Sequence, residues 1–515
     1  MASTITKGLP KFTTETLKLA AKQSQRCHIV PVRLRRAIKK YIQDQDVEHM
    51  RRKVLSLSKS FNEIKEVNLL LPTTSSKGLV EDPLKSMEQS QRWKVKTAYG
   101  DIGLRYHEDQ TIAYLAARMP AVYSALYRVL SEVRRRVPEF MPAKVLDFGA
   151  GTGSAMWAMM EVWPRSLETI NLVEPSQSMQ RAGQSLLKGL KNLPLIQSYG
   201  SIQALSKNTN KSGRQHDLVI ANLGDMIILS KFNGVKCIFY LDLYYNILVE
   251  PGTPQGSNII SQMRSHILWM EKRRSRKLQN AATMASNDLM TRKIGAYIVA
   301  PCPHDGACPL QNTDKYCHFV QRLERTSSQR AYKRSKDNSL RGYEDEKFSY
   351  IVFRRGTRPR GPWPLDGMTF ETLKEMHAKR IPEDLDIDTE NQFTTEVVAE
   401  DDQYEDQSAS SCDSDVSERD SVTENDDSEE DDDEVEKPRA DLGSGWGRII
   451  YMPLRRGKRV EFDVCRSTND EGTKGSFDRV VVTQSKNPTL HQQARRSIWG
   501  DLWPLRSGAT PKFFM

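Results

Sequence analysis

The stretch VLDFGAGTGSAMWA, residues 145 to 158, decides the fold that the sequence predicts. Its apolar start is typical of a buried strand, its glycines of a tight turn and its end of a helix. The glycines at positions 149, 151 and 153 follow the acid Asp147. Glycine lets the backbone turn sharply and approach a ligand closely, next to amides at the start of a helix. We therefore expect a small molecule to bind at this turn.

A second acid indicates which small molecule binds. The turn lacks the GxGxxG spacing that cradles the pyrophosphate of a dinucleotide. Glu174 ends the next apolar run, in INLVEPSQSM, where an acid accepts hydrogen bonds from both ribose hydroxyls. The pattern favours S-adenosylmethionine over NAD. A Rossmann sheet with an empty pocket is the alternative.

The surrounding segment, residues 143 to 260, alternates short apolar runs with helical stretches, which predicts an α/β fold with a doubly wound parallel sheet. The predicted strands are Val145 to Phe148, Ile170 to Val173, Asp217 to Ala221 and Ile247 to Val249.

The region before this segment, residues 31 to 140, is predicted to be helical. In AVYSALYRVLSEVRRR, residues 121 to 136, apolar side chains recur every three or four residues. This spacing predicts that Arg128 and Arg134 to Arg136 point largely toward solvent. They would then either contact RNA or form an ordinary solvated face.

Three cysteines lie in the proline-rich run PCPHDGACPLQNTDKYC, at residues 302, 308 and 317, directly after a predicted strand IGAYIVA at residues 294 to 300. Seven irregularly spaced cysteines in 515 residues do not resemble the dense disulfide framework of a small secreted protein. A metal centre is the better interpretation. Iron–sulfur clusters use cysteine thiolates, whereas zinc could also use His304 or His318.

The charge is distributed unevenly. The net charge is +10, but residues 401 to 434 alone contribute −16, which leaves +26 for the rest of the chain. Such an excess favours a polyanionic partner such as RNA. The acidic run, within residues 382 to 438, is too polar to bury a core, and we predict a disordered insertion. Residues 1 to 30 are basic and rich in hydroxyl side chains, which predicts an organelle import segment.

The C-terminal region combines strand patterns with basic residues. GWGRIIYMPLRRGKRVEFDVCRS, residues 445 to 467, predicts an exposed antiparallel strand pair, and SFDRVVVTQSK, residues 476 to 486, another strand. ARRSIWGDLW, residues 494 to 503, is interpreted as a short helix, with Trp499 and Trp503 either stacking on bases or anchoring the core. The basic side chains expected to line an RNA-binding surface are Arg448, Arg455, Arg456, Lys458 and Arg459.

Several of these motifs together resemble the methyltransferase-like protein 17 family of mitochondrial small-ribosomal-subunit assembly factors, with its fungal and bacterial relatives. The resemblance spans roughly residues 30 to 505 without the acidic insertion. It is carried by VLDFGAGTGSAMWA, LVEPSQSM, LVEPGTPQGS, PCPHDGACPL, EKFSYIVFRR and WGDLWP, in that order.

The resemblance implies a Rossmann-like class I methyltransferase fold and a cysteine-rich, β-rich C-terminal extension that binds a 4Fe-4S cluster. It also implies partners, namely the small-subunit rRNA and ribosomal proteins of the mitochondrial ribosome, in the matrix. The residues implied to bind S-adenosylmethionine are Asp147, Gly149, Gly151, Gly153 and Glu174. The implied cluster ligands are Cys302, Cys308, Cys317 and Cys465.

Catalysis is not predicted. The segment after the Asp217 to Ala221 strand reads NLGDM, without a catalytic signature, and Asp225 is the one acid nearby. An assembly factor without methyl transfer is the favoured interpretation, and an active rRNA methyltransferase is the alternative. The expected organisation is an import segment (1–30), a helical region (31–140), a methyltransferase-like domain (141–300), a cluster-binding extension (301–381 and 439–515) and the acidic insertion (382–438).

Overall fold

The computed structural model describes nine stretches of the chain, some with single-residue gaps. They are residues 21–22, 27–45, 49–57, 106–208 without 138, 216–222, 245–282, 295–333 without 312 and 314, 341–358, and 446–503 without 470 and 487. The acidic insertion, Asp225 and most of the import segment lie outside the described residues.

The larger of two sheets has eight strands, in the order β3-β2-β1-β4-β5-β8-β6, with β7 also paired to β8. Strands β1 to β5 are parallel and β8 is antiparallel to β5. The strand order reverses beside β1, which makes its carboxyl end the expected ligand site of a doubly wound sheet. The α/β prediction is confirmed. The bounds are β1 Lys144–Phe148, β2 Thr169–Val173, β3 Leu195–Tyr199, β4 Leu218–Asn222, β5 Tyr245–Pro251, β6 Ala296–Ala300, β7 Phe319–Glu324 and β8 Tyr343–Arg355.

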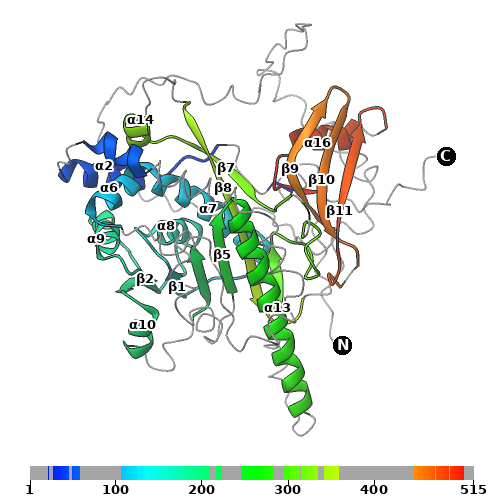
Figure 1. Cartoon of the computed structure of the whole chain (residues 1–515), viewed down its shortest axis with the longest axis horizontal. Coiled ribbons are helices and arrows are strands. Elements are labelled where there is room, and N and C mark those ends of the chain that lie inside the picture. The colour runs from blue at the N-terminus through cyan, green and yellow to red at the C-terminus, as the bar shows by residue number, and fades with distance from the viewer. Residues whose placement is uncertain are drawn as a thin grey trace, which may run out of the picture.

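Helices cover both faces of this sheet (Figure 1). Alternate residues of one strand point to opposite faces, so Val145 packs in one core and Leu146 in the other. The first core contains α2 (Val32–Asp44), α6 (Glu108–Ala117), α7 (Met119–Arg136), α8 (Ser154–Val162) and α9 (Gln177–Leu186). The second contains α10 (Ile202–Asn208) and α13 (Pro254–Ala282), whose end extends past the sheet in Figure 1. The short helix α14 (Ser327–Lys333) follows β7.

Helix α7 confirms the helix predicted at residues 121 to 136 but not the exposure of all its arginines. Arg128 is buried, and its guanidinium donates to the carbonyl of Val320 at 2.5 Å. Arg135 is exposed, as predicted. The prediction for Arg128 was wrong because β7 packs on a side of the helix that the apolar spacing alone assigned to solvent.

The second sheet is antiparallel, in the order β11-β10-β9-β12, with helix α16 (Pro488–Arg496) on one face. Its strands are β9 Gly447–Arg456, β10 Arg459–Ser467, β11 Gly475–Thr483 and β12 Leu502–Trp503. The three longer strands confirm the predicted ones. Two details were wrong: β10 is largely buried, and α16 ends at Arg496, so that Leu502 and Trp503 form a strand paired with β9.

No helix among the described residues is long and apolar enough to cross a membrane.

Candidate cofactor and metal sites

The predicted glycine turn lies at the carboxyl end of β1. Gly149, Gly151 and Gly153 have φ angles of 73°, 55° and 87°, in the left-handed region that side chains with a Cβ rarely adopt. A Cβ built on Gly151 would meet no described atom within 4 Å. The turn therefore needs glycine for its backbone conformation, and it leaves open space beside Gly151.

Glu174 lies against this turn. Its Oε2 accepts a hydrogen bond from the backbone amide of Gly151 at 2.9 Å, and its Oε1 accepts one from the amide of Ser176 at 2.8 Å. Burial raises the pKa of Glu174. Two sequence-predicted residues are thus in direct contact, because β1 and β2 are parallel neighbours whose carboxyl ends meet.

Asp147 is fully buried, and neither of its carboxylate oxygens has a hydrogen-bond partner in the described part of the chain. Burial, and then the charge of Glu174, raise the pKa of Asp147 to about 7. A buried carboxyl without a partner is costly and usually marks a functional group. The chemistry that would satisfy it is a cation or a hydrogen-bond donor.

The cysteine-rich segment interrupts an edge strand. Ala300, at the end of β6, pairs with Val352 of β8, and Phe319, at the start of β7, pairs with Phe348 of the same strand. Both lie on the edge of β8 that β5 does not occupy, since Val352 and Phe348 also pair with β5. Residues 301 to 318 thus leave the sheet edge and rejoin it a few residues further along. We call residues 301 to 318 the cysteine loop.

The fourth predicted ligand, Cys465, comes from β10 and lies near the three thiols of the cysteine loop. Burial raises the pKa of the Cys465 thiol, and the charges of Cys302 and Cys308 raise it further. Burial and the charges of Cys302, Cys308 and Cys465 likewise raise the pKa of Cys317. The described cysteines form no disulfide. The four predicted thiols thus lie within electrostatic range of one another, and we call these four residues the cysteine group.

The two histidines considered as zinc ligands have different surroundings. The Nε2 of His304 lies 3.5 Å from the Sγ of Cys465, whereas His318 stacks on Tyr316 with ring centroids 4.4 Å apart. Burial lowers the pKa of both histidines to about 4. Among the residues that the structure describes, no three His, Cys, Asp or Glu side chains are grouped so as to hold a metal ion.

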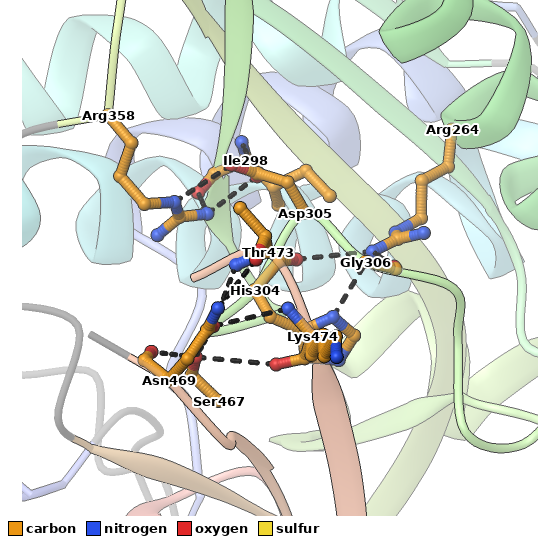
Figure 2. A network of polar contacts seen from close by, with 10 residues as sticks. All are labelled: Arg264, Ile298, His304, Asp305, Gly306, Arg358, Ser467, Asn469, Thr473 and Lys474. Carbon is orange, nitrogen blue, oxygen red and sulfur yellow. Dashed lines mark hydrogen bonds and ion pairs between the residues drawn. The ribbon is translucent and has the colours of Figure 1, made fainter. Parts of the chain in front are cut away.

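Polar contacts hold the cysteine loop against β6, against α13 and against the segment that follows β8 (Figure 2). Asp305 accepts two hydrogen bonds from the Arg358 guanidinium, at 2.9 and 2.6 Å, and one from the amide of Ile298 at 2.8 Å. Arg264 of α13 donates to the carbonyls of His304 and Gly306. A Cβ on Gly475 of β11 would lie 2.2 Å from the His304 ring. The loop therefore packs directly on the second sheet, and glycine is required at that contact.

A buried ion network joins the same loop to α7. The carboxylate of Glu132 accepts hydrogen bonds from Arg448 of β9, Arg136 and, at 2.7 Å, the Tyr350 hydroxyl. Arg448 also donates to the carbonyl of Pro301 at 3.2 Å, next to Cys302. Although burial opposes ionisation of Glu132, Arg448 and Arg136 hold its pKa well below the usual range. Arg448 was predicted to lie on an exposed basic surface, and this was wrong.

Comparison with known proteins identifies the family. A family described as "Mitochondrial small ribosomal subunit Rsm22" matches residues 108–365 and 392–504. The chain belongs to this family. The Rsm22 match covers both sheets and the cysteine loop, and it confirms the resemblance inferred from the motifs.

Named relatives of this Rsm22-family chain are mitochondrial proteins. The human "Ribosome assembly protein METTL17, mitochondrial" is 29% identical over 292 residues, which are 55% of this chain and 58% of that protein. The yeast Saccharomyces cerevisiae "Ribosome assembly protein RSM22, mitochondrial" is 22% identical, over 76% of this chain and 66% of the relative. A Schizosaccharomyces pombe Rsm22-cox11 tandem protein is 25% identical, over 83% of this chain and 48% of that protein. The chain thus spans about half to two thirds of these relatives. The prediction of a mitochondrial protein is confirmed at the level of the family.

Solved structures of methyltransferases are similar to this chain in fold only. The plantazolicin methyltransferase BpumL in complex with SAH is 9% identical, covering 46% of this chain and 84% of that chain, with a TM-score of 0.25. The magnesium protoporphyrin IX methyltransferase of Synechocystis with bound SAH is 14% identical, covering 50% and 90%, with a TM-score of 0.22. The scores are low, and the assignment of the fold rests on the strand order described above.

Sequence reasoning missed the Glu132 network and the interrupted edge strand. One signal was present in the sequence: Glu132 lies three residues after Val129 and beside Val133, within the apolar face of the predicted helix. An acid at such a position indicates a buried partner. Nothing in the pattern indicated that the partner would be Arg448, more than three hundred residues away.

Proposed function

We propose that this chain is an assembly factor of the mitochondrial small ribosomal subunit, which binds immature small-subunit rRNA and ribosomal proteins in the matrix. The observation that carries the proposal is the Rsm22 family match over both sheets, together with relatives named as ribosome assembly proteins. The proposal includes S-adenosylmethionine and a 4Fe-4S cluster, and it excludes methyl transfer. It keeps the predicted division into a methyltransferase-like domain and a cluster-binding extension.

Exposed cations support an RNA partner. The turn between β9 and β10 exposes Arg455, Arg456, Lys458 and Arg459 in a row. Lys and Arg side chains contribute most of the sequence-independent affinity for nucleic acid through phosphate contacts. Four of the five basic residues predicted at this surface are therefore exposed, although Arg455 also donates to carbonyls of α16 and Arg459 pairs with Glu461. The fifth, Arg448, belongs to the buried network instead.

The residues at the glycine turn fit S-adenosylmethionine. The cofactor carries an ammonium group, which is the chemistry that the unsatisfied carboxyl of Asp147 requires. It also carries ribose hydroxyls, which Glu174 would bind in place of the amides of Gly151 and Ser176. When bound, the cofactor offers a transferable methyl group. Without an acceptor-orienting group, these residues would bind it as a structural ligand that stabilises one conformation.

The four grouped thiols fit an iron–sulfur cluster better than zinc. A 4Fe-4S cluster is larger than an ion and is held by four cysteines. Four cysteines, Cys302, Cys308, Cys317 and Cys465, lie within electrostatic range of one another, which matches that number of ligands. Bound at these positions, a cluster would link β10 covalently to the cysteine loop. Zinc, with His304 replacing one thiol, is the alternative.

Sedimentation tests the ribosomal part of the proposal. A tagged protein in an organelle lysate should migrate on a density gradient with particles of small-subunit size. Cys302→Ser should abolish this co-migration, and Cys27→Ser, which lies outside the thiol group, should not. If the parent protein stays with free proteins at the top of the gradient, the proposed assembly function is wrong.

A transfer assay tests the absence of catalysis. The parent and Gly151→Asp are incubated with radiolabelled S-adenosylmethionine and small-subunit RNA. We expect no transfer above background from either protein. Methyl transfer by the parent that the Gly151→Asp variant loses would instead establish the alternative, an active rRNA methyltransferase.

A further inference from the structure

A groove lined mainly by polar and basic residues lies between α16 and the β9–β10 turn, on the second sheet. Its volume is about 490 Å³, and it is lined by Gly457, Gln484, Pro488, His491, Gln492 and Arg495. Helix α16 packs on the face of β10 that carries Val460, Phe462 and Val464. Cys465 belongs to the opposite face because side chains alternate along a strand. The groove is therefore separate from both the cysteine group and the glycine turn.

The lining combines a cation, two amides and an incompletely satisfied imidazole. Gln484 and Gln492 are exposed, and the exposed Arg495 donates to the carbonyl of Gly457 at 3.0 Å. His491 is 5% exposed, and its Nε2 has no hydrogen-bond partner among the residues that the structure describes. None of the six lining residues is acidic.

The surroundings of the groove are also basic. Lys458 in the adjacent turn, Lys486 after β11 and Arg496 at the end of α16 are exposed. Arg455 fixes the end of α16 against the turn by donating to the carbonyls of Arg495 and Ser497, at 2.9 and 2.8 Å. The cations would attract a phosphate, and the amides of the two glutamines offer both donors and acceptors to a base edge.

We propose that this groove binds one unpaired nucleotide of the small-subunit rRNA, an inference that rests on the proposed function. Its volume lies within the range of about 300–1,000 Å³ that is typical of small-molecule sites. An RNA duplex keeps its base edges paired and offers chiefly phosphates and 2′-hydroxyls, whereas a single strand releases a base that can enter a pocket. The side-chain amides of Gln484 and Gln492, with the buried imidazole of His491, suit the polar edge of a base. The basic residues around the groove suit the flanking phosphates.

The test compares the full-length chain with a Gln484→Glu/Gln492→Glu variant. Both side chains are exposed, so the changes add negative charge to the groove without disturbing the core. Gln203→Glu, at an exposed position of α10, adds one negative charge away from the groove and is the control. Fluorescence anisotropy measures the affinity for octauridylate and octaadenylate, for a duplex of equal length, and for free AMP. Sedimentation with small-subunit particles is measured in parallel.

We expect the double variant to bind one or both single-stranded oligonucleotides roughly five- to tenfold more weakly, because like charges oppose the flanking phosphates. Duplex binding should change less than twofold, and the Gln203→Glu control should match the parent throughout. An equal loss for single strand and duplex would overturn the inference, since it indicates a general electrostatic surface. AMP binding as tight as that of the oligonucleotides would also overturn it. If the parent binds particles but the double variant binds every probe as the parent does, the groove inference fails while the proposed function stands.

Discussion

The glycine turn and the cysteine group are both sites built from predicted residues, but they are assembled in different ways. Every residue named at the glycine turn lies between positions 147 and 176, at the carboxyl ends of the two adjacent parallel strands β1 and β2. The cysteine group combines an excursion from an edge strand with a residue of the second sheet, about 150 positions further along. The first site is local in the sequence, and the second exists only if two sheets are held together.

This difference determines what stabilises each site. The glycine turn is held by backbone conformation and by the amides that bind Glu174. The cysteine group depends on contacts between the second sheet and the rest of the fold. One of these contacts is the buried pair of Glu132 on α7 and Arg448 on β9, with side chains 0% and 1% exposed. Breaking an inter-sheet contact should therefore affect stability more than changing the turn.

Arg448→Met is expected to have the largest effect. It removes the cation from a buried carboxylate that also binds Arg136 and Tyr350, and breaking a buried pair typically costs about 3–5 kcal/mol of folding stability. Urea denaturation measures the loss. Arg181→Met, which breaks an exposed pair with Glu108 at 3.0 Å, is the control and should cost less than about 1 kcal/mol. Equal, small effects from both changes would show that the Glu132 network does not hold the sheets together.

Cys465→Ser should have the next largest effect and should separate cluster binding from sheet docking. The variant should lose bound iron and acid-labile sulfide, while the Glu132 network keeps the second sheet in place. We expect a stability loss of about 1–3 kcal/mol, within the usual range for a single substitution. Iron and sulfide analysis with urea denaturation measures both quantities. Cys27→Ser should retain the full iron content, and retention by Cys465→Ser would remove this residue from the ligand set.

The same difference between local and long-range contacts determines which features the sequence could predict. The strands, the glycine turn and the contact of Glu174 with it follow from short-range patterns, because neighbouring parallel strands bring their ends together. The positions of Arg128 and Arg448 did not follow. Both are long cationic side chains that look solvent-exposed in a periodic pattern, and both are buried by elements distant in the sequence, β7 for Arg128 and α7 for Arg448.

The interrupted edge strand could not be predicted from the sequence either. The runs that form β6 and β7 each have a strand pattern, but pairing with one continuous partner, β8, is a property of the assembled sheet. The last strand gives another example. The sequence left open whether Trp503 stacks on bases or anchors the core. Trp503 is 1% exposed because β12 pairs with β9, so it anchors the core.

Asp147→Asn should stabilise the cofactor-free protein in a pH-dependent way. The pKa of Asp147 is raised to about 7 from 3.8, so the folded state holds the proton more tightly than the unfolded chain. Stability then falls as the pH rises from about 4 to 7, by up to about 1.4 kcal/mol per pH unit. The asparagine stays neutral and avoids this loss, so we expect a clear net gain in stability at pH 8 and little gain at pH 4.

Thermal denaturation at both pH values tests this prediction. Asp217→Asn is the control, because the Asp217 carboxylate accepts hydrogen bonds from the amides of Ala143 and Lys144, both at 2.9 Å. It should destabilise the protein at pH 8. A gain for Asp147→Asn that is equal at pH 4 and pH 8 would contradict a buried, titrating carboxyl.

Gly151→Ala should have a small effect on stability and should distinguish backbone strain from ligand contact. Its φ of 55° is left-handed, which costs an alanine roughly 1–2 kcal/mol, and the added Cβ meets no described atom within 4 Å. Gly189, with a φ of 87° and equally open surroundings, gives a matched control at the turn after α9. Both alanine variants should melt slightly earlier than the parent. Only Gly151→Ala should weaken S-adenosylmethionine binding, by about tenfold in calorimetry, since its methyl group enters the open space at the glycine turn. Equal affinities for the two variants would mean that the glycine is needed for the turn alone and that the cofactor lies elsewhere.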